Sequence, residues 1–175
     1  MLMALAALSA PVRTQGKRVE KPENVKAMML AKFAAFLTKA NGPKPAKDQP
    51  LRIGIVGADA TAAAAQKALP GRQVDGRPVE IVAITLDDAR AGRSPCDLLY
   101  VATDVEAAAL AEIVAAHRTR AVPLIAERRG FAGSGGGIQL FLDGDNVRFQ
   151  VNQEALKAQG VVPAPQFLNL SRKAP

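Results

Sequence analysis

Short, continuously apolar runs alternate along the chain with longer segments of helical periodicity. The runs cover residues 51–57, 78–84, 97–103 and 121–126. Strands that are covered on both faces of a sheet have this uniformly apolar character. Because each run is followed by a helical segment, the pattern predicts a mostly parallel sheet with helices on both faces. The expected fold class is therefore α/β, with about six strands once a C-terminal antiparallel hairpin is included.

The segment from Pro22 to Ala40 predicts the first helix, with Pro22 in its first turn. Lys26 and Lys39 fall away from the apolar face of this helix. A proline-rich stretch at residues 41–50 ends it. The residues expected on the apolar face are Val25, Met29, Phe33, Phe36 and Leu37.

Helix-capping residues follow two of the predicted strands. Asp59 or Thr61 can cap an alanine-rich helix that runs to Leu69, and Pro70-Gly71 closes it. Thr103 and Glu106 have the spacing of a capping box for a helix over residues 104–117. A weaker helix is expected near residues 86–91, and Asn152 can cap a short helix that Gly160 ends. The side chains expected to point inward from the 104–117 helix are Val105, Leu110, Ile113 and Val114.

The glycine-rich stretch at residues 133–137 raises the question of a phosphate-binding loop. The residues after it alternate apolar and polar on both sides of Asp143-Gly144, which predicts a hairpin of strands. A phosphate cradle needs a following helix N-terminus, and the P-loop adds a lysine and a hydroxyl residue. Since a strand follows here, the glycines are interpreted as turn residues, and neither a nucleotide nor another cofactor is expected.

Length and composition fit one globular domain. The chain has 175 residues, of which 49% are hydrophobic, and tryptophan is absent. Nine of the 23 basic residues lie in the first 50 positions against three acidic ones, so the net charge of +7 belongs mainly to that part. Because no basic stripe is interleaved with aromatic residues, nucleic-acid binding is not expected.

The first 22 residues are interpreted as a signal-like segment followed by a linker, and residues 23–175 as one domain. About ten apolar residues open the chain, too few to span a bilayer. Ala7 and Ser9 would suit a cleavage site before Ala10, although the basic start of a signal peptide is missing. A start codon assigned too late would account for that gap. The alternative is the apolar tail of a cytoplasmic protein.

Cys96 and His117 are the single cysteine and the single histidine of the chain. One cysteine excludes an internal disulfide and a cysteine-based zinc site. His117 ends a helical pattern, where its charge would complement the helix C-terminus. No G-x-S-x-G motif presents a nucleophilic serine, so neither a catalytic nor a metal site is expected.

Several of these motifs together resemble the YfiR family over about residues 24–172. They are VKAMMLAKFAAFL at 25–37, LRIGIVG at 51–57, GRPVEIV at 76–82, CDLLYV at 96–101 and the long run from GFAGSGGG to QGV at 130–161. The resemblance rests on their order and spacing across the whole domain.

The resemblance implies a periplasmic, non-catalytic regulatory protein. Such a protein would bind the periplasmic sensor domain of a membrane-bound GGDEF protein, restrain its diguanylate cyclase activity and so affect biofilm formation. The chain itself is not expected to be transmembrane, and a homodimer is an open alternative. The C-terminal apolar group suggests a partner-binding surface at Phe167 or Leu168, flanked by Gln166 and Arg172.

A second functional hypothesis is a periplasmic small-ligand or peptide binding protein. Parallel α/β sheets bind ligands in the crevice at the carboxyl ends of their strands. In this chain the crevice would lie near Gly57, Ala58, Thr103 and Asp104.

The glycine interpretation predicts that the domain of residues 24–175 binds neither ATP nor GTP at micromolar concentration. The physical reason is that a strand follows the glycines, so no helix N-terminus directs backbone amides at a phosphate. Calorimetric titration with both nucleotides checks this. A saturable site would contradict the prediction.

Overall fold

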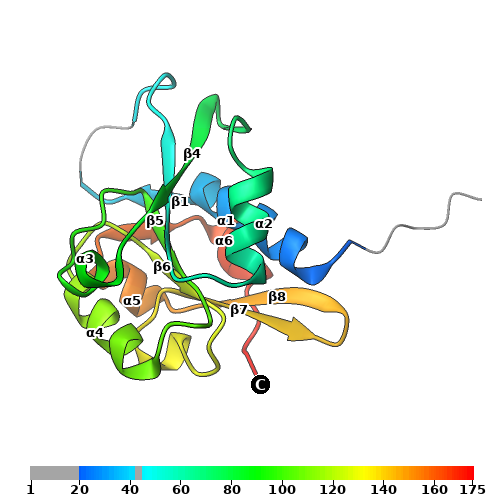
Figure 1. Ribbon diagram of the computed structural model, residues 1–175, viewed down its shortest axis with the longest axis vertical. Helices are drawn as coiled ribbons and strands as arrows, with labels where there is room; N and C mark the ends of the chain where they lie inside the picture. The colour runs from blue at the N-terminus through cyan, green and yellow to red at the C-terminus, as the bar shows by residue number, and fades with distance from the viewer. Residues whose placement is uncertain (1–19, 42–44) are drawn as a thin grey trace, which may run out of the picture.

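The computed structural model describes residues 20–41 and 45–175, so most of the signal-like segment lies outside the described residues. One sheet of seven strands organises the domain (Figure 1). Its strands are β2 (Leu51–Val56), β3 (Gln73–Val74), β4 (Arg77–Ala83), β5 (Leu98–Val101), β6 (Leu124–Ala126), β7 (Ile138–Asp143) and β8 (Asn146–Val151).

The strands lie in the order β3-β4-β2-β5-β6-β7-β8. Neighbours from β4 to β7 are parallel, and β3 and β8 are antiparallel edge strands. The predicted α/β class with a mostly parallel sheet is confirmed. The short strand β3 makes this sheet one strand larger than expected.

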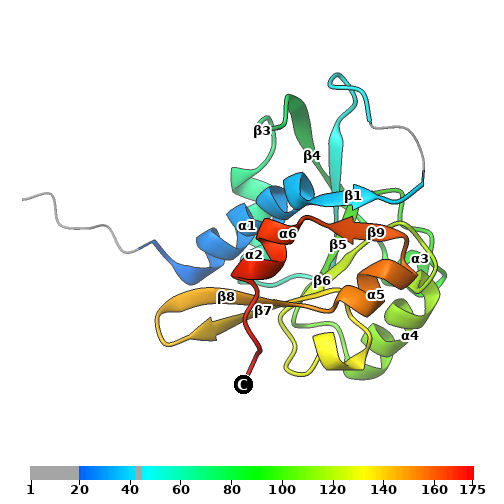
Figure 2. The ribbon, with the colours of Figure 1, turned by 180° about the vertical axis from the view of Figure 1, so that it is seen from behind.

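Helices cover both faces of the sheet, as the alternating pattern predicted (Figures 1 and 2). Helices α1 and α2, with α6, pack on one face, while α3 and α4 pack on the other. A short 3-10 helix, η1, precedes β7. The bounds are α1 (Pro22–Phe36), α2 (Ala60–Ala68), α3 (Leu86–Arg90), α4 (Ala107–His117), η1 (Ala132–Ser134), α5 (Gln153–Ala158) and α6 (Pro165–Leu170).

Strand β5 shows how the two faces are filled. Leu98 and Tyr100 point into the core beneath α1 and α2, whereas Leu99 and Val101 point into the core beneath α4. All four side chains are at most 1% exposed. Alternation along a strand sends successive side chains to opposite faces, so a strand covered on both sides must be apolar throughout.

The first helix ends earlier than the sequence predicted. It stops at Phe36, and β1 (Leu37–Lys39) continues the chain in extended conformation. β1 pairs antiparallel with β9 (Val161–Pro163), with Thr38 opposite Val162. The expected helix to Ala40 is therefore wrong over its last residues, because a strand partner more than 120 positions away offers hydrogen bonds there.

The buried face of α1 also differs from the predicted one. Of the five residues expected on it, Phe33 is buried and the other four are half-buried. The fully covered face includes Lys26, which the sequence pattern had placed elsewhere. Since α1 packs against α2 on the same face of the sheet, small side chains allow the close approach that this packing needs. The other buried residues are Ala27, Leu30 and Ala31.

The capping predictions have mixed outcomes. Asp59 caps α2 by accepting a hydrogen bond from the Ala62 amide at 2.7 Å, and Asn152 caps α5 through the Ala155 amide at 3.0 Å. The predicted capping box at Thr103 and Glu106 does not form. Helix α4 begins later, at Ala107, and Glu106 makes no side-chain cap.

The C-terminal hairpin is confirmed. β7 and β8 pair antiparallel, with Asp143 opposite Asn146 across the two-residue turn. The outer edge of β8 is partly covered by the end of the chain. The Arg172 amide donates to the Phe149 carbonyl at 2.8 Å, and the Val151 amide donates to Ser171 Oγ at 2.9 Å. Covering an edge strand in this way blocks unwanted pairing with other chains.

Replacing Phe149 by alanine should reduce the free energy of unfolding by about 3 kcal/mol, because the substitution leaves a cavity in the core. Phe149 is 7% exposed, and its ring centroid lies 4.9 Å from that of Phe33 and 4.8 Å from that of Phe167. Urea denaturation of the variant and the wild type measures the difference. A loss below about half a kilocalorie per mole would place Phe149 outside the core.

Candidate functional site

The predicted partner-binding residues lie on α6 and the tail that follows it. Phe167 is only 1% exposed and belongs to the core, where its ring stacks on those of Phe36 and Phe149 and meets Phe33 edge-on. Offset and edge-on aromatic packing of this kind stabilises a core beyond simple area burial. Phe167 therefore anchors α6 to α1 and β8, and its side chain offers no surface to a partner.

The residues around Phe167 remain accessible. Gln166 and Arg172 are exposed, and Leu168 is half-buried. Leu170 is 57% exposed, which is high for a large apolar side chain. Arg172 donates from Nη1 to the carbonyls of Asn169 and Ser171, both at 3.0 Å, so its guanidinium is held against the end of α6. The structure thus divides the predicted group into a buried anchor and an exposed surface.

The crevice of the second hypothesis lies at the point where the strand order reverses, between β2 and β5. The Ala58 amide donates one bifurcated hydrogen bond to the Asp104 carboxylate, at 2.9 Å to Oδ1 and 3.0 Å to Oδ2. Gly57 has a positive φ of 81°, and an added Cβ there would collide with the Asp104 carboxylate. The loops after β2 and β5 are therefore fastened to each other.

Asp59 also joins these two loops. Its Oδ2 accepts from the Thr103 amide at 2.8 Å, while its Oδ1 caps α2. Backbone amides at such a switch point are the groups that bind an anionic ligand in doubly wound folds. In this chain the amides of Ala58, Ala62 and Thr103 are occupied by the protein's own carboxylates. The crevice near Gly57, Ala58, Thr103 and Asp104 does not support the ligand-binding hypothesis at that place.

A polar network lies beside this closure, under the N-terminal half of α1. Glu127, directly after β6, binds Lys26 Nζ through Oε2 at 2.6 Å and the Thr61 hydroxyl through Oε1 at 2.6 Å. The Tyr100 hydroxyl lies 2.8 Å from Asp59 Oδ2 and 2.9 Å from Glu127 Oε1. The side chains of Lys26 and Glu127 are 11% and 14% exposed. Buried charges persist in proteins when they are paired and hydrogen-bonded, as these are.

The hydrogen-bonded network has a structural role. Burial, together with the carboxylates of Glu127 and Asp59, raises the pKa of Tyr100 far above its usual value, so the phenol keeps its proton. Lys26 balances the charge of Glu127 and ties α1 to the carboxyl end of the sheet. The sequence held a signal for part of this cluster, because Asp59, Asp104 and Glu127 each follow a predicted parallel strand and must meet at one edge.

Cys96 and His117, the two remaining candidate residues, are both buried. Burial raises the pKa of the Cys96 thiol to about 12, so the thiol stays protonated. His117 is fully buried, with its ring nitrogens 2.9 Å from the Ile113 carbonyl and 3.0 Å from Ser94 Oγ. Burial lowers the pKa of His117, so the expected charge at the end of α4 is replaced by a neutral, hydrogen-bonded core histidine.

The glycine-rich stretch serves packing. It forms η1 and then enters β7, as the turn interpretation predicted. A Cβ at Gly136 would collide with the ring of Phe131, which is itself buried. Close approach of an aromatic ring to the backbone therefore explains glycine at this position.

The described residues 20–41 and 45–175 contain no cluster of three or more histidine, cysteine or acidic side chains arranged to hold a metal ion. Within the same ranges, every helix is too short or too polar to cross a bilayer.

Comparison with known proteins gives one family match and a distant structural match. The profile of the DUF4154 family, described as YfiR/HmsC-like, matches residues 23–172. A crystal structure described as a conserved domain protein from Vibrio cholerae O1 biovar El Tor has a TM-score of 0.54 and 12% sequence identity. The match covers 86% of this chain and 59% of that one, and at this identity it supports the fold only. No curated protein sequence matches.

The fold defines an α/β domain whose switch point is occupied by the chain's own carboxylates. The chain belongs to the YfiR/HmsC-like family, because the family profile spans nearly all of the domain. This membership confirms the predicted YfiR resemblance. It supports a regulatory role for the protein.

Replacing Lys26 by methionine should lower the free energy of unfolding by about 3 kcal/mol or more, because Glu127 would keep a buried charge without its partner. The double variant Lys26→Met/Glu127→Gln should recover a large part of the loss. Lys32→Met, on the exposed side of α1, is the matched control and should change stability by less than about half a kilocalorie per mole. Equal losses in the two single lysine variants would contradict a role for the ion pair.

Proposed function

We propose that the protein is a periplasmic regulator that restrains a membrane-bound diguanylate cyclase by binding the sensor domain of that enzyme. In the absence of a releasing signal, the complex would keep the synthesis of cyclic di-GMP low and limit biofilm formation. The observation that carries the proposal is the family match over residues 23–172, since this family regulates diguanylate cyclases. The signal-like segment at the start of residues 1–22 would then act as the export signal, and the rest of that range as a linker.

The C-terminal end of the domain is the best candidate for the partner contact. We define the docking surface as Gln166, Leu168, Leu170 and Arg172. An exposed leucine beside polar and cationic groups is typical of a protein interface, in which an apolar centre is surrounded by a polar rim. Because Phe167 fixes α6 to the core, this surface is held in place before a partner binds, which reduces the entropic cost of association.

Substitutions on the docking surface should weaken partner binding without unfolding the protein. Leu170→Asp and Arg172→Glu are each expected to reduce affinity for the periplasmic domain of the cognate GGDEF protein by about tenfold or more, as loss of an interface hot spot does. Capture from solubilised membranes and surface plasmon resonance measure binding, and cellular cyclic di-GMP should rise in strains carrying either variant.

Leu86→Asp is the matched control, because Leu86 is 39% exposed on α3, across the sheet from α6. It should bind like the wild type. Melting temperatures separate loss of contact from loss of fold. If both docking variants melt normally, bind fully and still keep cyclic di-GMP low, the partner contact lies elsewhere on the domain. If the wild-type protein itself neither binds the sensor domain nor lowers cyclic di-GMP, the proposed function is refuted.

A further inference from the structure

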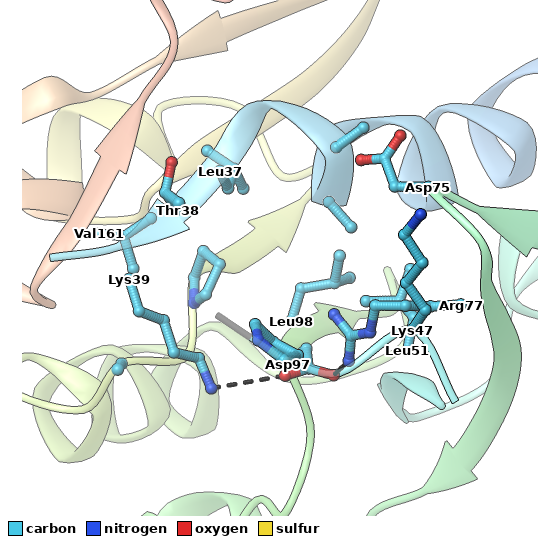
Figure 3. A pocket seen from close by; sticks show the side chains of 15 residues that line it. Leu37, Thr38, Lys39, Lys47, Leu51, Asp75, Arg77, Asp97, Leu98 and Val161 are labelled. Carbon is cyan, nitrogen blue, oxygen red and sulfur yellow. Dashed lines mark hydrogen bonds and ion pairs between the residues drawn. The ribbon is translucent and has the colours of Figure 1, made fainter. Parts of the chain in front are cut away.

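A cavity of about 500 Å³ lies at the end of the sheet opposite to the closed switch point (Figure 3). Residues at or next to the amino-terminal ends of four parallel strands line it, namely Leu51, Arg77, Asp97, Leu98 and Pro123. The last turn of α1, strand β1 and Val161 of β9 complete its wall. Its volume falls within the range of about 300–1,000 Å³ that is common for small-molecule sites.

The inner part of the cavity is apolar. Leu51, Leu98 and Val161 are each 2% exposed or less, so they form a buried floor, and the accessible apolar side chains of the lining include Ala35, Leu37 and Ala121. Leu37 faces them from β1, as Figure 3 shows. An aliphatic or aromatic group placed here would be removed from water on several sides, and this burial is the main driving force for binding an apolar group.

The charged groups of the cavity do not contribute equally. Asp97 already accepts hydrogen bonds from the Arg52 amide at 3.0 Å and from Arg77 Nη2 at 2.9 Å. Arg77 also donates to the carbonyls of Gln49 and Pro50, at 3.1 and 2.8 Å. Asp97 and Arg77 thus hold the starts of β2 and β4 together, and both are committed to the fold.

Two lysines line the cavity as well. Lys39 lies 3.4 Å from Asp97 Oδ1 and its side chain is 44% exposed, so this contact is long and weak. Lys47 is exposed, on the opposite side of the cavity from Lys39 in Figure 3. Asp75 supplies a negative charge near Lys47. With Asp97 and Arg77 engaged, the two lysines outnumber Asp75, and the balance of charge favours an incoming anion.

We propose that this cavity is a binding site for a small organic anion. The ligand is specifically a monocarboxylate whose apolar body is small enough to fit in about 500 Å³. The apolar body lies against Ala35, Leu37 and Ala121, above the floor of buried side chains, and the carboxylate lies at the rim beside Lys39 or Lys47. The proposal concerns this chain by itself and does not depend on the identity of the partner.

Sodium octanoate, kept below its micellar concentration, is the test probe for the full chain. Titration followed by ¹H–¹⁵N NMR should show saturable binding with amide shifts centred on Leu51, Leu98 and Val161. Octylammonium has the same apolar body and the opposite charge, and it should bind roughly tenfold more weakly because attraction to the lysines becomes repulsion. Lys39→Gln and Lys47→Gln should each weaken octanoate binding about two- to fivefold, as expected for exposed ion pairs.

Lys67→Gln, on the exposed side of α2, is the matched charge control and should bind octanoate like the wild type. Ala35→Phe adds bulk at an exposed position of the cavity wall and should abolish binding without a change in melting temperature. The proposal is overturned if octanoate does not saturate, if its shifts map outside the cavity, or if octylammonium binds equally well. It is also overturned if the double variant Lys39→Gln/Lys47→Gln binds octanoate with unchanged affinity.

Discussion

The binding of the chain's own carboxylates to the backbone at the carboxyl end of the sheet is the interaction on which the rest of the structure depends. Asp59 and Asp104 accept hydrogen bonds from amides in the loops after β2 and β5, and Glu127 joins the same edge through Tyr100. A negative charge close to the start of a helix and to free amides is favourable. The switch point of the sheet, a ligand site in many related architectures, is therefore occupied by the protein itself.

This arrangement also fixes the first helix. Lys26 reaches from α1 to Glu127, so the helix that opens the domain is tied to the far end of β6 by a buried ion pair. Ion pairs of this kind add little net stability compared with apolar packing, but losing one partner is costly. Their effect is to specify one position for α1 over the sheet, which in turn positions Phe33 and Phe36 to receive Phe167.

The two ends of the sheet consequently differ in what they can do. At the carboxyl end the polar groups satisfy one another, whereas at the amino end Asp97 and Arg77 join the strands and leave a cavity beside them. The C-terminal segment contributes to the cavity, to the core and to the exposed surface. It pairs β9 with β1 beside the cavity, buries Phe167 in the core, and then exposes Leu170 and Arg172.

The sequence by itself determined the elements whose signals are local. Continuous apolar runs identified β2, β4, β5 and β6, because a strand that is buried on both faces must be apolar throughout. Alternation around Asp143-Gly144 identified the hairpin, because burial of one face imposes a period of two residues along a strand. The order and spacing of motifs also indicated the family. Asp59 and Asn152 were found as caps because a cap acts within three residues of its own position.

Only the tertiary structure decided the features that depend on distant partners. Helix α1 ends at Phe36 because β9 supplies a strand partner, and no local pattern contains that partner. Lys26 is buried because Glu127 follows β6, and the Thr103 amide, which a capping box would pair with Glu106, binds Asp59 instead. Phe167 and Leu170 are both apolar residues of one short helix, and their period could not show which of them faces the core. Burial of a side chain and pairing of a charge are properties of the neighbours that folding brings together, so the sequence pattern could name the candidate residues but could not assign their roles.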